Sequence, residues 1–213
     1  MPKQNKINKI IKVLIVSDIF FSSGWGLIGP IFAIFLLQDI QGGSAQVAGF
    51  AMAIYWITKS ILQIPLAKYL DRNHGEKDDF LFMAGGLFIS GLVPFGYLVS
   101  FLPWHIYALQ VVYAIGMAMA VPAWYAIFTR HIDSGSEAYE WSVYSTMLGF
   151  AFGISGAIGG LIVGFAGFKV IYFIVGIFTI ASSVSLLFIK NDLICPHPRK
   201  KKLQKSIPPW MPF

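Results

Sequence analysis

The sequence predicts an all-α integral membrane protein with six transmembrane helices, and three observations carry this prediction. Hydrophobic residues make up 56% of the chain and charged residues only 12%, against the roughly 25% charged residues of a soluble domain. The charges gather in short clusters, and the stretches between them are nearly uncharged. Six of these stretches reach the length of about 20 apolar residues that a helix needs to span a bilayer. They cover about 13–37, 45–69, 80–102, 105–129, 142–166 and 169–190.

The distribution of Lys and Arg predicts the orientation, because cytoplasmic loops carry an excess of positive charge. With the N-terminus inside, fourteen of the sixteen Lys and Arg residues lie on the cytoplasmic side. Lys169 lies outside, and Lys59 lies within the second span. We therefore predict a multi-pass protein of the cytoplasmic (inner) membrane. Residues 1–190 form its transmembrane domain, and 191–213 form a basic, proline-rich cytoplasmic tail. The lipid bilayer explains the composition, and no nucleic-acid partner is expected.

The two halves of the six-span unit resemble each other, which predicts an internal repeat. Three segments of the first half recur in order in the second, at offsets of 92, 100 and 90 residues. The matched pairs are Pro30–Phe35 with Pro122–Phe128, Gly49–Ile54 with Gly149–Ile154, and Gly86–Ser90 with Gly176–Ile180. Because three is an odd number of spans, the second copy enters the membrane from the opposite side. Such a 3+3 inverted repeat is common in secondary transporters.

Two charged residues lie inside the predicted spans, where a charge is costly and is usually functional or paired. Asp18 and Lys59 differ in depth by about 6 Å at the rise of an α-helix, so they can be a structural pair or two parts of a solute or ion pathway. Other polar and aromatic residues follow them along the same helix faces. They are Ser22 and Trp25 in span one, Tyr55 and Gln63 in span two, and Gln110, Tyr113 and Trp124 in span four. Individually, the aromatic residues are more typical of packing than of ligand contacts.

Small residues recur every three or four positions along span five, among them Gly149, Gly153, Gly156 and Gly160. This spacing predicts a helix-packing seam, because glycines let helix backbones approach closely. The same segment contains a Gly-x-Ser-Gly sequence like that of rhomboid intramembrane proteases. Those enzymes need a histidine on another transmembrane helix, whereas the four histidines here fall in loops, at a helix end or in the tail. We therefore predict that the protein is not an enzyme.

Cofactor chemistry has little support in the sequence. The single cysteine, Cys195, excludes an internal disulfide and a cysteine metal cluster. No Gly-x-x-x-x-Gly-Lys nucleotide motif is present. We therefore predict no metal, no cofactor and no ATP drive within this chain.

The loop after span two carries a recognisable motif. Asp71, Arg72 and Gly75 match the cytoplasmic loop signature Gly-x-x-x-Asp-Arg-x-Gly-Arg-Arg, with one residue inserted before Gly75. Through this motif the chain resembles the major facilitator superfamily. The resemblance implies one six-helix half of a twelve-helix fold and a cytoplasmic gate at Asp71. Gln110 stands where the family's fourth span has an arginine that is often tied to proton coupling.

The resemblance implies a secondary transporter that moves a small solute by alternating access. Half of the fold needs a second half, so we expect a homodimer. Whether a coupling ion takes part stays open. One further hypothesis is a membrane interaction or assembly subunit without transport activity. Another is a fragment of a twelve-helix transporter, against which the proline-rich tail argues because it looks like a finished end. A lysine in a partly aromatic cavity favours an anionic or amphipathic solute.

Overall fold

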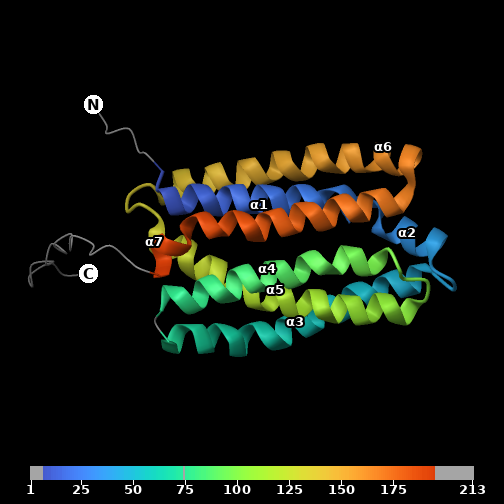
Figure 1. The fold of residues 1–213 in the computed structure, drawn as a ribbon, viewed down its shortest axis with the longest axis horizontal. Coiled ribbons are helices and arrows are strands. Elements are labelled where there is room, and N and C mark those ends of the chain that lie inside the picture. The colour runs from blue at the N-terminus through green and yellow to red at the C-terminus, as the bar shows by residue number, and fades with distance from the viewer. Residues whose placement is uncertain (1–6, 74, 195–213) are drawn as a thin grey trace, which may run out of the picture.

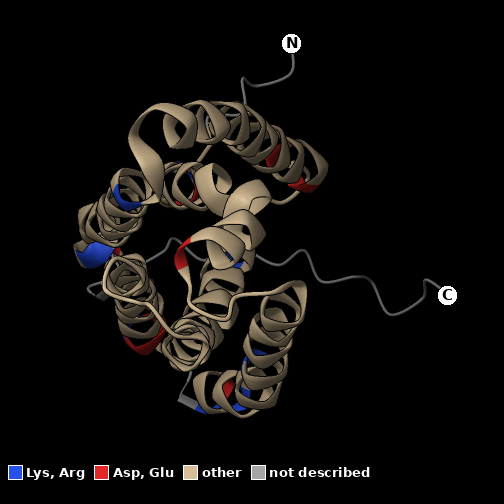
Figure 2. Ribbon diagram, turned by 90° about the vertical axis from the view of Figure 1, so that its right-hand side faces the viewer, with Lys and Arg blue, Asp and Glu red and all other residues tan. Residues whose placement is uncertain are grey.

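The computed structural model describes residues 7–73 and 75–194, and the regular structure of these residues is helical (Figure 1). Five helices of this part of the chain are long and apolar enough to cross a membrane: Lys9–Asp39, Ala45–Arg72, Glu76–Tyr97, Pro103–His131 and Glu137–Leu193. The predicted all-α class is therefore confirmed. Figure 2 views the helices end-on and shows that most of the ribbon belongs to uncharged residues. From residue 195 on, the predicted tail lies outside the described residues.

The first apolar segment is interrupted rather than continuous. Helix α1 (Lys9–Ile28) begins after Asn8, whose side-chain oxygen accepts a hydrogen bond from the backbone N–H of Ile10 at 3.1 Å. This bond satisfies one of the N–H groups that the start of a helix leaves free. The segment continues as a 3₁₀ turn, η1 (Gly29–Ile31), and as α2 (Phe32–Asp39). Pro30 has no backbone N–H to donate, so the helical geometry changes at this point.

Helices α3 (Ala45–Asn73), α4 (Glu76–Tyr97) and α5 (Pro103–His131) form a second group, in which α5 packs against both α3 and α4. The contact between α4 and α5 is close because two glycines meet there. A Cβ atom on Gly86 would overlap the backbone carbonyl oxygen of Gly116. Small residues of this kind let helices in a membrane approach each other closely. Helices α4 and α5 therefore meet backbone to backbone.

Helix α6 (Glu137–Ser185) turns back on itself at Gly167 (Figure 1). Gly167 has a φ of 76° and a ψ of 175°, a conformation that is open to glycine because it has no Cβ. The turn separates a first limb, 137–166, from a second limb, 168–185. The chain then passes through η2 (Leu186–Ile189) into α7 (Lys190–Ile194). Six crossings in an inverted repeat stay a prediction, because the fifth apolar helix contains both limbs.

Helix α1 packs against α6, and small residues bring the two helices together. A Cβ atom on Gly159 would overlap the backbone carbonyl oxygen of Leu27, and a Cβ atom on Gly26 would lie 3.1 Å from the Cβ of Ser155. On the second limb, the hydroxyl of Ser182 lies 2.9 Å from that of Ser17. Close approach and a buried hydrogen bond thus hold α1 to both limbs of α6.

The glycine stripe predicted on this segment does not form a seam within the chain. The stripe consists of Gly149, Gly153, Gly156 and Gly160. Three of these glycines have open space where a Cβ would stand, and at Gly156 a Cβ would make only an ordinary contact, 3.7 Å from the nearest atom of α1. Each residue turns a helix by about 100°, so the stripe lies to one side of the line through Ser155 and Gly159 that meets α1.

Adjacent glycines on α6 provide a matched test of this packing. We expect Gly159→Ala to push α6 away from α1 and to cost about 1–3 kcal/mol of stability, the usual effect of overpacking. The matched control is Gly160→Ala, which places a methyl group in space that is open within one chain. In monomeric protein it should leave stability equal or slightly higher because alanine favours helix. Thermal unfolding of both variants in the same detergent measures the difference. Equal melting temperatures would contradict the described contact.

Candidate functional site

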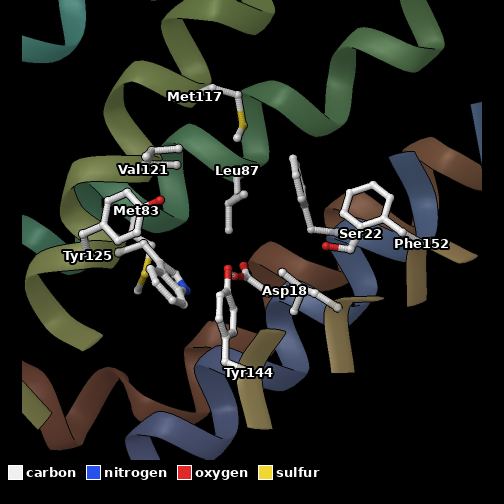
Figure 3. A pocket seen from close by; sticks show the side chains of 13 residues that line it. Asp18, Ser22, Met83, Leu87, Met117, Val121, Tyr125, Tyr144 and Phe152 are labelled. Atoms are coloured by element: carbon white, nitrogen blue, oxygen red, sulfur yellow. Dashed lines mark hydrogen bonds between the residues drawn. The ribbon is translucent and has the colours of Figure 1, made fainter. Parts of the chain in front are cut away.

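A cavity of about 200 Å³ opens between α1, α4, α5 and the first limb of α6 (Figure 3). Asp18 is the charged residue of its lining, and most of the other side chains are aromatic or aliphatic. The lining residues are Asp18, Phe21, Ser22, Met83, Leu87, Met117, Ala120, Val121, Trp124, Tyr125, Tyr144, Leu148 and Phe152. The cavity is therefore apolar, with a single acidic group.

Asp18 is held by a neutral partner. The Tyr144 hydroxyl donates a hydrogen bond to Asp18 Oδ2 at 2.9 Å, and Figure 3 shows the two side chains meeting between α1 and α6. Among the described residues, no Lys, Arg or His forms an ion pair with Asp18. An ionised carboxylate is costly in apolar surroundings unless it is paired. Asp18 is therefore the group of this cavity that can hold a proton or a cation.

Lys59 lies outside the cavity lining and has different neighbours. Its Nζ is 4.9 Å from the ring centroid of Trp56 and 5.8 Å from that of Tyr55. Aromatic faces attract a cation through the negative charge of the π system. No ion pair joins Lys59 to Asp18, although both residues are described. Of the two alternatives for these charges, the structural pair is therefore not formed within the described chain.

Three of the predicted aromatic residues stack into a column that joins α1, α5 and α3. The rings of Trp25 and Tyr113 are 4.1 Å apart between centroids and 26° from parallel. Those of Tyr113 and Tyr55 are 4.8 Å apart and 22° from parallel. Aromatic contacts of this kind stabilise packed helices. The column links the two groups of helices and so has a clear packing role.

The remaining predicted pathway residues divide between the cavity and the helix contacts. Ser22 and Trp124 line the cavity together with Asp18. Gln110 is buried in α5 and Gln63 is half-buried in α3, and neither belongs to the lining. The structure therefore brings together residues from spans one and four, whereas the residues predicted on span two lie elsewhere.

Tyr144 is a site residue that the sequence analysis missed. It shares one face of the first limb of α6 with Leu148 and Phe152, at intervals of four residues, and all three line the cavity. Residues four apart lie on the same side of a helix, so this periodicity could have revealed the face. The prediction for this helix was based instead on its more conspicuous glycine stripe.

The predicted gate residues lie where two helices end and begin. Asp71 and Arg72 are exposed in the last turn of α3, and Gly75 precedes α4 as its N-cap. Close to them lies an ion pair that the sequence did not reveal. Arg130, at the end of α5, donates to the carboxylate of Asp79, whose side chain is only 1% exposed. This pair ties the start of α4 to the end of α5.

Long apolar helices around a cavity with one acidic group define a multi-pass membrane protein. Comparison with known proteins gives the family. The family model described as Major Facilitator Superfamily matches residues 14–212. The chain therefore belongs to the Major Facilitator Superfamily, and the family predicted from the Asp71-Arg72 motif is confirmed. No curated protein and no solved structure matches the chain.

The buried ion pair of Asp79 predicts a large effect on stability. Asp79→Asn leaves the Arg130 guanidinium without its countercharge, and removing one partner of a buried pair costs about 3–5 kcal/mol. Since Arg130 is partly exposed, we expect the lower end of this range. The control is Asp192→Asn, which breaks the exposed pair with Lys9 and should cost at most about 1 kcal/mol. Thermal unfolding in detergent compares them, and equal losses would refute the assignment.

Proposed function

We propose that this protein is a secondary transporter that moves a small solute across the membrane by alternating access, as a homodimer of six-helix halves. Family membership supports transport as the general function. The observation that carries the proposal is the cavity between α1, α4, α5 and α6, where the hydrogen-bond partner of Asp18 among the described residues is a neutral tyrosine. A carboxylate of this kind can bind and release a charged solute or a coupling ion as the cavity changes its access.

The six-crossing arrangement is part of this proposal. The first limb of α6 has 30 residues, which at about 1.5 Å each is longer than the roughly 30 Å of hydrocarbon. The turn at Gly167 would then be a loop at the membrane surface, and the second limb would be the sixth crossing. The unequal distribution of Lys and Arg supports placing both termini in the cytoplasm, at the inner membrane of a cell.

A second copy would complete the site. Large apolar side chains are exposed along α3 and the first limb of α6, including Phe50 and Phe150, each 63% exposed. Tyr125 and Phe152, on the edge of the cavity, are exposed as well. A second copy against this face would cover the cavity and give the outward glycines of α6 a helix to pack against. The exposed Asp71 end of α3 would then meet segment 140–145 of the partner copy.

The other predicted residues have proposed roles around this path. Asp18, Ser22 and Trp124 would contact the solute, while Trp25, Tyr55 and Tyr113 would hold the helices that move. Part of the path would be formed jointly with residues of the second copy, and this part would be lined by Lys59, Gln63 and Gln110. Asp71, Arg72 and Gly75 would form the gate at the cytoplasmic end. An assembly subunit without transport activity would keep the exposed faces but would not need Asp18.

Transport itself is tested with purified protein in proteoliposomes. A thermal-shift screen of metabolites and drugs first identifies solutes that stabilise the protein, and flux of each such solute is then measured. We expect Asp18→Asn to abolish flux, because it removes the charge of the cavity, and Lys59→Ala to reduce it. Lys12→Gln, a change at an exposed lysine of α1, should leave flux unchanged. Normal flux in a folded Asp18→Asn protein would show that the site is wrongly assigned.

The homodimer is tested by disulfide cross-linking in membranes. Two differently tagged copies, one with Ala67→Cys and one with Ser145→Cys, are expressed together in a Cys195→Ser background. We expect a product that carries both tags after mild oxidation, since the proposed interface brings these positions together. Copies with Phe188→Cys, which is 75% exposed on a different segment, serve as the control and should stay monomeric. Failure to form the mixed product would contradict the proposed interface.

A further inference from the structure

The charge balance of the cavity indicates what kind of solute fits it. Asp18 is the charged residue of the lining, and its hydrogen-bond partner is the neutral hydroxyl of Tyr144. Two cations of the neighbouring helices have other partners: Lys59 lies over aromatic rings of its own helix, and Arg130 pairs with Asp79. No positive group of the described residues neutralises Asp18. When Asp18 is ionised, a ligand that enters the cavity therefore meets a net negative charge, which a cationic ligand would balance.

The rest of the lining favours an apolar cation. The rings of Phe21, Trp124 and Tyr144 can face a positive charge, which aromatic faces attract. Met83 and Met117 add flexible, polarizable side chains that adapt to the shape of a ligand. The indole Nε1 of Trp124 is buried and has no hydrogen-bond partner among the described residues, so it can donate to an oxygen of the ligand. The cavity thus combines one acid with a large apolar wall.

Solutes of other classes fit this lining less well. A carboxylate or phosphate would be repelled by Asp18, whose charge acts strongly where water is scarce. A sugar needs many hydrogen-bond partners, whereas the lining offers few polar groups beyond Ser22, Trp124 and two tyrosines. A hard metal cation takes six or more oxygen ligands, which this lining does not supply. Among charged and strongly polar solutes, these exclusions leave an organic cation.

We propose that the cavity binds small amphipathic organic cations, such as protonated or quaternary amines with an aromatic or aliphatic body. The cation would approach Asp18 and its body would pack against the aromatic and methionine side chains. That these compounds are transported rests on the proposed function above, but their binding requires only the cavity. The sequence alone pointed to an anionic or amphipathic solute because it placed Lys59 in the cavity, where the structure does not place it.

Three ligands of similar shape and different charge test the proposal: phenyltrimethylammonium, its neutral carbon analogue tert-butylbenzene, and benzenesulfonate. Their affinities for the purified full-length protein are measured by calorimetry and by tryptophan fluorescence. We expect the cation to bind at least about tenfold more tightly than the neutral compound, and the sulfonate not to bind. Equal binding of all three ligands, or tighter binding of the sulfonate, would overturn the proposal.

Variants locate the source of this preference. Asp18→Asn should remove the advantage of the cation and leave binding of the neutral compound unchanged. Asp18→Glu keeps the charge and should keep the preference for the cation. This variant provides a second test if the asparagine variant does not fold. Asp39→Asn, an acidic residue of α2 outside the cavity, is the control and should behave as the wild type. A preference for the cation that survives in Asp18→Asn would refute the role of Asp18.

Flux measurements separate this proposal from the proposed function. Selective binding of the cation without any flux would leave the cavity as a cation site and would count against transport. Flux of another solute, together with no preference among the three ligands, would support transport and refute the ligand class.

Discussion

The close approach of α1 to the first limb of α6 is the contact on which the site depends. Gly159 lets the backbone of α6 reach the carbonyl of Leu27, and Ser155 sits against Gly26 in the same contact. Tyr144 lies on the same limb, and its hydroxyl donates a hydrogen bond to the carboxylate of Asp18 on α1. A wider gap between these helices would separate the hydroxyl from the carboxylate. The packing of small residues therefore determines how the acid of the cavity is held.

Two closely packed groups of helices explain why a cavity forms between them. Helix α1 packs on α6, while α4 packs on α5 through Gly86 and Gly116. The stacked rings of Trp25, Tyr113 and Tyr55 bridge the two groups, and Met83 and Met117 line the same cavity as Asp18. The second limb of α6 also packs directly on α4, where the Ser183 hydroxyl donates a hydrogen bond to the backbone carbonyl oxygen of Ala84 at 2.8 Å.

The sequence was most informative where a single physical rule applies. Uncharged stretches of membrane-spanning length predicted the helical class, and Asp71 with Arg72 predicted the family. Prediction was weaker for contacts between helices, because a stripe of glycines shows which face of a helix carries small residues but not which neighbouring helix packs against that face. Gly159, rather than Gly160, contacts α1.

Asp18 could be found because a charge in an apolar span stands out, whereas Tyr144 is one of many aromatic residues. Lys59 stands out equally, but it lies on α3, which contributes no residue to the cavity lining.

Infrared difference spectroscopy of the Asp18 side chain tests most directly whether α1–α6 packing holds the acid of the cavity. The Asp18 band is identified as the carboxyl signal that disappears in Asp18→Asn. We predict that this band shifts in Tyr144→Phe, which loses the hydrogen-bond donor, and shifts in the same direction in Gly159→Ala, which moves α6 away from α1. A band that stays in place in both variants would contradict the central role of this contact.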